Sequence, residues 1–247
     1  MSHSSSDALS GLSIPSTPEQ AQEILDQLAK RSRRSFLGQS LAAAAVPATL
    51  LAASSVGEAA TRTRRPPYLP IPTTVISNNF REIAADENTH VNTVALTIQA
   101  LGGRPRPFPT FQGLQATSAA DFLAKSIAFE NTGVHAYLGA APYISNPGIA
   151  AVATSIALVE AYHSGFLNSL GAQPLVPTGA FATPFTVQQV AAAASPFIVN
   201  LNDNGAFPAS YGTTPSAAND IAILNFALLL ELLEATFYNI NVPVLFP

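Results

Sequence analysis

The chain has 247 residues, and it contains no cysteine and few charged residues, at 11% of the total. Without cysteine there can be no disulfide, no iron–sulfur cluster, no thiolate zinc site and no cysteine nucleophile. Any metal that the side chains bind must therefore be held by carboxylates and imidazoles.

Basic residues are also scarce. The chain has 11 Lys plus Arg and a formal net charge of −4, and Lys125 is the only basic residue after position 106. This distribution argues against a phosphate-binding surface, so we expect no nucleic-acid partner. Hydrophobic residues make up 48% of the chain, which is enough for one sizeable core. Length and composition favour one domain with additional segments over two domains.

What the chain does contain is a repeated spacing of glutamate and histidine. Glu87 precedes His90 by three residues, and Glu160 precedes His163 by three. On a helix this spacing places both side chains on one face, one turn apart. Six Glu and three His lie beyond residue 60, and chance would give about 0.1 such pairs. Two such motifs, with one further Glu from each of two other helices, form a two-metal carboxylate site in a four-helix bundle.

The hydrophobic pattern predicts an all-α bundle. Apolar residues recur with helical spacing over 75–101, 118–138, 148–170 and 221–240. Asn219 and Asp220 are expected to cap the last of these helices. Residues 171–218 are rich in proline and form a long crossover connection, with one short helix predicted over 186–194.

The second and last predicted helices supply the missing glutamates. Glu130 and Glu231 each stand seven residues before a tyrosine, Tyr137 and Tyr238. Seven residues is two helical turns, so each tyrosine is expected on its glutamate's face, donating hydrogen bonds to ligand carboxylates. Glu234 is expected behind the ligands or facing a partner. The predicted ligands, from four helices, are Glu87, His90, Glu130, Glu160, His163 and Glu231.

Four carboxylates and two neutral imidazoles balance the charge of two divalent ions. Hard oxygen ligands combined with imidazole suit iron or manganese. His135 lies about 140° around the helix from Glu130 and is predicted to be satisfied or exposed, outside the site. Arg81, Glu82 and Asp86 are expected to form a solvated helix face without a chemical role.

The first sixty residues are predicted to be an export signal. Arg33 and Arg34 precede Phe36 and Leu37, and an uncharged run follows over 38–57. This pattern resembles the twin-arginine signal, which implies an exported protein, periplasmic or extracellular. The alternative is an uncleaved membrane anchor. The domain prediction is a signal over 1–60, a Pro/Arg-rich linker over 61–73 and a bundle over 74–247. No stable membrane insertion is expected of the mature chain, because glutamates in the last helix are costly in lipid.

Within residues 75–240, the stretches 129–134, 137–142 and 223–231 resemble the ferritin-like superfamily, and more narrowly its desiccation-related branch. The resemblance implies a ferritin-like four-helix bundle with a circularly permuted order, because the helix that comes first in that branch comes last here. The long crossover can return this helix to its own bundle or to a neighbouring chain. A homodimer swapped through the last helix is therefore one possible assembly.

The resemblance also implies redox chemistry on a small molecule: peroxide, O₂ or ferrous iron. Since the chain lacks the cysteine-bound electron donor of rubrerythrin-like relatives, peroxide disproportionation and ferrous iron oxidation are favoured within this class. The competing hypothesis is a non-catalytic desiccation or stress protein, whose metals stabilise the bundle without turnover. Iron storage in a cage is disfavoured by the Ala-rich helices and the long connection.

Overall fold

The computed structural model describes residues 72–203, 210–212 and 214–247. The predicted signal, and the linker up to residue 71, lie outside the described residues. The described chain is all-α, as predicted, with a minimal two-stranded sheet. Its elements, in chain order, are α2 (Thr73–Ala100), β1 (Thr110–Phe111), α3 (Ala119–Ala140), η3 (Ala141–Tyr143), α4 (Pro147–Leu170), α5 (Val187–Ala194), η4 (Ser195–Phe197), β2 (Ile198–Asn200) and α6 (Ala217–Leu245).

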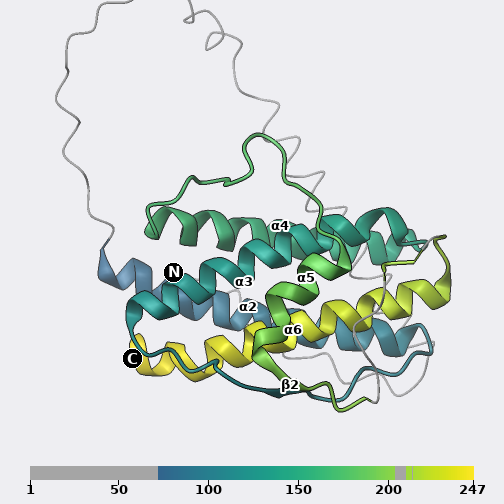
Figure 1. The fold of residues 1–247 in the computed structure, drawn as a ribbon, viewed down its shortest axis with the longest axis horizontal. Helices are drawn as coiled ribbons and strands as arrows, with labels where there is room; N and C mark the ends of the chain where they lie inside the picture. The colour runs from purple at the N-terminus through teal and green to yellow at the C-terminus, as the bar shows by residue number, and fades with distance from the viewer. Residues whose placement is uncertain (1–71, 204–209, 213) are drawn as a thin grey trace, which may run out of the picture.

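Four long helices form the bundle (Figure 1). Helix α2 packs mainly against α6, and α3 packs mainly against α4. Helix α5 lies against α3, outside the four-helix bundle. Strands β1 and β2 pair in antiparallel fashion and tie together the two long connections. The last helix therefore returns to the bundle of its own chain, where it completes the four-helix arrangement.

Local sequence signals set where three helices begin. The Ser118 hydroxyl accepts a hydrogen bond from Asp121 N at 3.1 Å, at the start of α3. The Asn146 side chain caps α4, whose first residue is Pro147. Thr186 opens α5 with a capping box. Each of these caps satisfies backbone N–H groups that a helix leaves free at its start, and each predicted start is confirmed.

The prediction for the ends of α6 was wrong. Ser216 is the N-cap, and its hydroxyl accepts from Asn219 N at 3.2 Å. Asp220 instead accepts from Ser145 N and Ser145 Oγ, both at 2.7 Å, so it joins α6 to the start of α4. The helix also passes the predicted end near residue 240 and includes Pro243. Tertiary packing extends this turn, because the Phe246 ring stacks on Phe80 with centroids 4.5 Å apart.

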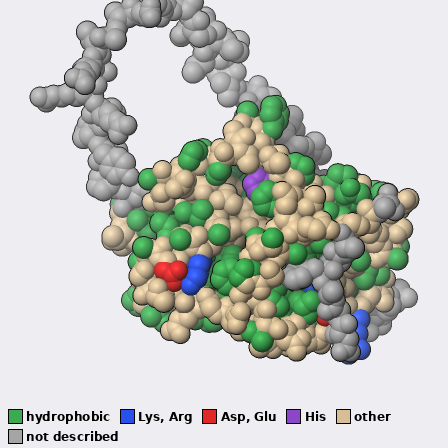
Figure 2. All heavy atoms as spheres, viewed as in Figure 1, with side chains coloured by type: hydrophobic (Ala, Val, Ile, Leu, Met, Phe, Trp, Pro, Cys, Tyr) green, Lys and Arg blue, Asp and Glu red, His purple; other side chains and the backbone are tan. Residues whose placement is uncertain are grey.

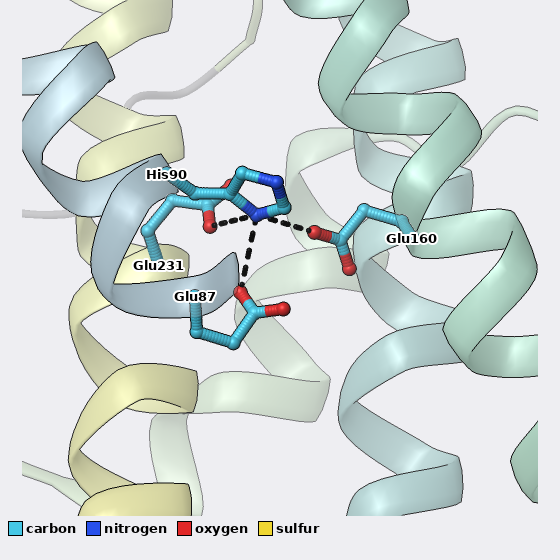
Figure 3. A group of neighbouring side chains, drawn as sticks. All are labelled: Glu87, His90, Glu160 and Glu231. Carbon is cyan, nitrogen blue, oxygen red and sulfur yellow. Dashed lines mark hydrogen bonds and ion pairs between the residues drawn. The ribbon is translucent and has the colours of Figure 1, made fainter. Parts of the chain in front are cut away.

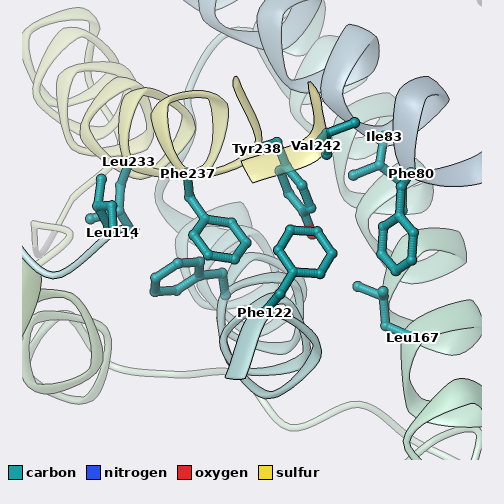
Figure 4. Close-up of a cluster of buried hydrophobic side chains, with 10 residues drawn as sticks. Phe80, Ile83, Leu114, Phe122, Leu167, Leu233, Phe237, Tyr238 and Val242 are labelled. Carbon is teal, nitrogen blue, oxygen red and sulfur yellow. The ribbon is translucent and has the colours of Figure 1, made fainter. Parts of the chain in front are cut away.

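Apolar layers fill the bundle on both sides of its middle. One cluster, shown in Figure 4, includes Phe80, Phe122 and Phe237, and the last two rings stack with centroids 5.2 Å apart. A second cluster includes Val94, Ile156 and other aliphatic side chains of α2, α4 and α6. Burial of these groups is the main source of stability. Between the two clusters lie the buried carboxylates and imidazoles described below.

Two described helices, α4 and α6, are long and apolar enough to cross a membrane by length and composition alone. Both belong to the bundle, and two-thirds of the apolar window of α6 is buried inside it. Core helices of soluble proteins pass the same test. Charged side chains are sparse on the face of the protein in Figure 2, as the composition predicts.

Candidate metal site

The structure brings together all six predicted ligands in the middle of the bundle. Their four carboxylates are at most 1% exposed, and both imidazoles are 7% exposed. Each bundle helix contributes, since α2 and α4 carry the Glu-x-x-His motifs and α3 and α6 carry one glutamate each. The ligand atoms form two groups, and within each group they lie within 4.8 Å of one another.

The first group surrounds the Nδ1 atom of His90, and we name it the His90 position (Figure 3). Three carboxylate oxygens approach this nitrogen: Glu160 Oε1 at 3.1 Å, Glu87 Oε2 at 3.3 Å and Glu231 Oε2 at 3.3 Å. The carboxylates come from three helices and point toward one centre. One imidazole nitrogen with three carboxylates is a suitable donor set for a hard divalent ion.

The second group, the His163 position, contains Glu87, Glu130, Glu160 and His163. The Nδ1 atom of His163 lies 3.2 Å from Glu87 Oε1 and 3.2 Å from Glu130 Oε2. The two imidazole rings have centroids 6.5 Å apart. Glu87 and Glu160 belong to both groups. These two glutamates are therefore placed to bridge a pair of adjacent ions, while Glu130 and Glu231 each serve one position.

Two tyrosines donate hydrogen bonds to the predicted ligand carboxylates, and each tyrosine lies on a different helix from the carboxylate it contacts. Tyr238, on α6, donates from its hydroxyl to Glu130 Oε1 at 2.6 Å. Tyr137, on α3, donates to Glu231 Oε1. Each tyrosine therefore contacts the glutamate of the other helix, and the sequence spacing alone had not revealed this exchange. Such hydrogen bonds fix the orientation of a ligand carboxylate.

Glu234 is buried one turn beyond Glu231 and lies near the site, with 3% of its surface exposed. A methyl group at Gly133 would come 2.9 Å from Glu160 Oε2 and 3.5 Å from Glu234 Oε1. The Glu160 carboxylate therefore occupies space that exists because residue 133 has no side chain, whereas Glu234 would be in ordinary contact with the added methyl group. Burial, and then the negative charge of Glu160, raises the pKa of Glu234 well above its ordinary value.

Asp86 corrects the sequence prediction. It was expected on a solvated face without a chemical role, yet its Oδ2 atom lies 3.2 Å from Nε2 of His163. The side chain is 39% exposed, so its polarity suggested only solvent contact. No local signal in the sequence pointed to this contact, because it joins residues 77 positions apart on two different helices. A carboxylate behind a ligand imidazole orients the ring and raises its basicity.

His135 also differs from its prediction, which was a satisfied or exposed side chain. The residue is only 7% exposed, and its Nδ1 atom has no hydrogen-bond partner among the described residues. Its ring stacks on Phe185 with centroids 4.5 Å apart. Helix α5 and its approach cover this side of α3, which explains the burial that a helical wheel could not predict.

The protonation of the site reflects crowded negative charge. Burial and the neighbouring Glu130 carboxylate raise the pKa of Glu87 to about 7, and burial raises the pKa of Glu160 well above its ordinary value. Burial alone would lower the pKa of His163, but hydrogen bonds with Asp86, Glu130 and Glu87 outweigh it and raise that pKa to about 12. The pKa of His90 is raised for the same reason, chiefly by Glu160. Protons on these groups therefore compensate the carboxylate charges.

The donor set fits a pair of divalent ions. Buried carboxylate oxygens normally accept hydrogen bonds, yet four in this site accept no well-directed hydrogen bond among the described residues. Three of them have an imidazole nitrogen within 3.3 Å as their charged neighbour. Such oxygens are costly unless a cation lies beside them. The four atoms are Glu87 Oε1, Glu160 Oε1, Glu160 Oε2 and Glu231 Oε2.

A pocket of about 290 Å³ leads from the surface to one side of the site. It lies between α2 and α4, and His163 and Asp86 form part of its wall. Asn79 and Glu82 add polar groups, and Val159, Tyr162 and Phe166 add apolar ones. The volume is sufficient for water, peroxide or O₂ to reach the His163 ring, the one predicted ligand that lines the pocket.

An all-α bundle with paired Glu-x-x-His motifs and two further inward glutamates is the architecture of ferritin-like di-metal proteins. The family profile of the ferritin-like domain matches residues 69–173. This range is less than half of the chain and contains α2, α3 and α4 with five of the six predicted ligands, so this part of the chain is similar to the ferritin-like domain. Searches of the curated proteins and of the solved structures gave no significant match.

Proposed function

We propose that the protein binds two iron or manganese ions and uses them for redox chemistry on peroxide, O₂ or ferrous iron. The observation that carries this proposal is the presence of two four-residue ligand groups that share Glu87 and Glu160. Shared carboxylates hold two ions close together, as two-metal chemistry requires. The total charge of four carboxylates also matches that of two divalent ions.

The side chains divide into distinct roles. Glu87 and Glu160 would bridge the two positions, while Glu130 and Glu231 would each hold one ion in an orientation set by a tyrosine hydroxyl. Bound iron or manganese would supply electron transfer that amino-acid side chains cannot perform. The buried carboxylates are shielded from bulk water, and the pocket would bring a small substrate as far as the His163 ring.

The first test is metal content. Protein loaded with ferrous iron or manganese under anaerobic conditions and then desalted should retain about two equivalents per chain. Glu160→Ala removes a ligand shared by both positions and should abolish stable binding at both. Glu82→Gln is the matched control, because it removes an exposed carboxylate that lines the pocket outside the ligand groups. Retention below about one equivalent by the wild-type protein would refute the di-metal proposal.

The second test is turnover of peroxide and of ferrous iron by the loaded protein. Redox function predicts activity that is lost in Glu130→Ala and kept in Glu82→Gln. Full metal content without turnover on either substrate would instead support the non-catalytic stress protein, with metals that stabilise the bundle. The pocket that reaches His163 favours turnover, because a purely structural site needs no opening to solvent.

We also infer that the protein is exported by the twin-arginine route, because Arg33 and Arg34 stand before an uncharged run. Cell fractionation of the full chain tests this inference. Replacement of both arginines by lysine preserves the charge and should retain the protein in the cytoplasm. Export of the double variant at the wild-type level would contradict the route.

A further inference from the structure

The two Glu-x-x-His motifs differ in the residue directly before the glutamate. Asp86 precedes Glu87 on α2, whereas Val159 precedes Glu160 on α4. The Asp86 carboxylate lies 3.2 Å from His163 Nε2, so it supports an imidazole on the opposite helix. A valine offers no hydrogen-bond acceptor. The chain thus has a supporting carboxylate at one motif and none at the matching place in the other.

The packing of α2 against α4 shows which imidazole lacks support. Contacts between these helices follow an antiparallel register, since Phe80 meets Phe166, Asp86 meets His163 and His90 meets Glu160. Val159 directly precedes Glu160, the residue that meets His90, and so holds the place on α4 that Asp86 holds on α2. Among the described residues, none is hydrogen-bonded to the Nε2 atom of His90. His90 is therefore oriented only through Nδ1, the atom that would bind an ion.

We infer that the two metal positions are unequal and that the His163 position binds its ion first and more tightly. This inference rests on the proposed di-metal function. Each position has three glutamates and one imidazole, so the ligand count does not distinguish them. Asp86 distinguishes the two positions. Nε2–H of His163 donates to its carboxylate, so Nδ1 of His163 keeps its lone pair toward the ion. The added carboxylate also increases the negative potential on that side.

The position of the pocket agrees with this order. His163 and Asp86 line the pocket of about 290 Å³ between α2 and α4, and Glu82 lines it further along α2. Of the residues in the two ligand groups, His163 alone lines this pocket, so an ion that came by this route would approach the His163 side first. Affinity and access therefore favour the same position.

A cobalt(II) titration of the metal-free, full-length protein, followed by absorbance and calorimetry, tests the inference. The wild-type protein should bind two equivalents in two steps that differ by roughly ten-fold or more in affinity. Asp86→Leu should weaken the tighter step by about 10- to 100-fold. Asp86→Asn should restore most of the loss, because its amide oxygen still accepts from Nε2–H. Glu82→Gln, which keeps Asp86 in place, is the matched control and should change neither step by more than about two-fold.

The converse variant supplies the missing group. Val159→Asp places a carboxylate at the matching site on α4. It should increase the cobalt affinity of the weaker step, so the affinities of the two binding steps should become more similar. Two equal wild-type affinities, or an affinity ratio unchanged by both Asp86→Leu and Val159→Asp, would overturn the inference and leave the di-metal proposal standing. Absence of any cobalt binding by the folded wild-type protein would overturn the di-metal proposal itself, and circular dichroism verifies that each variant is folded.

Discussion

At the scale of single residues, the site is governed by how buried charges are neutralised. The raised pKa of Glu87, about 7, arises from burial and from the nearby Glu130 carboxylate. The raised pKa of His163, about 12, arises from carboxylate partners that outweigh burial. In the metal-free protein at neutral pH, both imidazoles therefore carry a proton, and Glu87 carries one part of the time.

Metal binding should consequently release protons. The ligand atoms bind an ion only when deprotonated, so each imidazole must lose its proton, and below about pH 7 Glu87 must lose one too. Apparent affinity is expected to rise with pH, most steeply below about pH 7 where the carboxyl group is protonated. Calorimetry in buffers of different ionisation enthalpy should show more than two protons released per loaded chain at neutral pH, because Glu160 and, in part, Glu87 lose protons besides the two imidazoles. An affinity that is constant between about pH 6 and pH 8 would contradict this protonation scheme.

Replacement of Gly133 should change metal affinity without lowering the stability of the metal-free protein. In Gly133→Ala the new methyl group would lie 2.9 Å from Glu160 Oε2, so the ligand carboxylate must move. Metal affinity should fall, while the metal-free protein keeps its stability or gains up to about 1 kcal/mol of helix propensity. The measurements are a metal titration and urea unfolding of the metal-free form.

The control is Gly165→Ala on α4. Its methyl group would lie 3.4 Å from Leu175 Cδ1, which is ordinary contact, and it points away from the ligands. It should leave metal affinity unchanged. Equal metal affinity in Gly133→Ala and wild-type protein would show that Glu160 has room to shift without cost.

At the scale of elements, the long helices could be predicted because their signals are local. Apolar spacing and the caps Ser118, Asn146 and Thr186 each depend on neighbours within a few residues. The ends of α6 could not, because Pro243 is held in the helix by packing of Phe246 on a distant aromatic ring. The strands β1 and β2 were also missed, because strands of two and three residues are too short to show a periodic pattern in the sequence.

The candidate site shows the same division between local and long-range information. The Glu-x-x-His motifs were visible in the sequence because their members lie on one helical face. The pairing of Asp86 with His163 was not, because it joins residues 77 positions apart on different helices. The exchange of the two tyrosines, Tyr137 and Tyr238, likewise depends on how the helix pairs dock. Local spacing therefore identified the candidate ligands, but not the groups that hold them in place.

The junction between α4 and α6 provides a prediction at this scale. Asp220 is 1% exposed and accepts three hydrogen bonds, from Ser145 N, Ser145 Oγ and Asn146 N. Asp220→Ala leaves these donors without a partner and should lower the free energy of unfolding by about 3 kcal/mol. Urea unfolding measures the change. Thr154→Ala, at an exposed site on α4, should stay within about 0.5 kcal/mol of wild type. If Asp220→Ala lowered the free energy of unfolding by no more than about 0.5 kcal/mol, the junction between α4 and α6 would contribute little to stability.

At the scale of the whole molecule, the start of α2 and the end of α6 are neighbours. Phe80 stacks on Phe246, and Arg81 donates from Nη2 to Phe246 O at 2.9 Å. The order of helices along the chain is therefore not dictated by the shape of the bundle. We therefore expect that the chain could begin with α6 instead of α2 with little change in packing; the permuted order that the resemblance implied stays a prediction.

A circular permutant tests this reading. It would start at Ser210, continue to Pro247, pass through a short Gly/Ser linker into Pro72 and end at Asp203. Because the new connection joins neighbouring ends, the permutant should fold with wild-type helix content and bind metal with wild-type stoichiometry. Circular dichroism and metal analysis give the result. A folded permutant that binds no metal would show that the native connection shapes the site.

The exchange of the two tyrosine hydroxyls has a consequence for assembly. Tyr137 on α3 serves a glutamate of α6, and Tyr238 on α6 serves a glutamate of α3. Each ion position likewise borrows one bridging glutamate from the other helix pair. Neither pair alone holds a complete coordination sphere. An ion bound at either proposed position would therefore need both helix pairs docked in the native register, so metal binding would favour the fully assembled bundle over either pair alone.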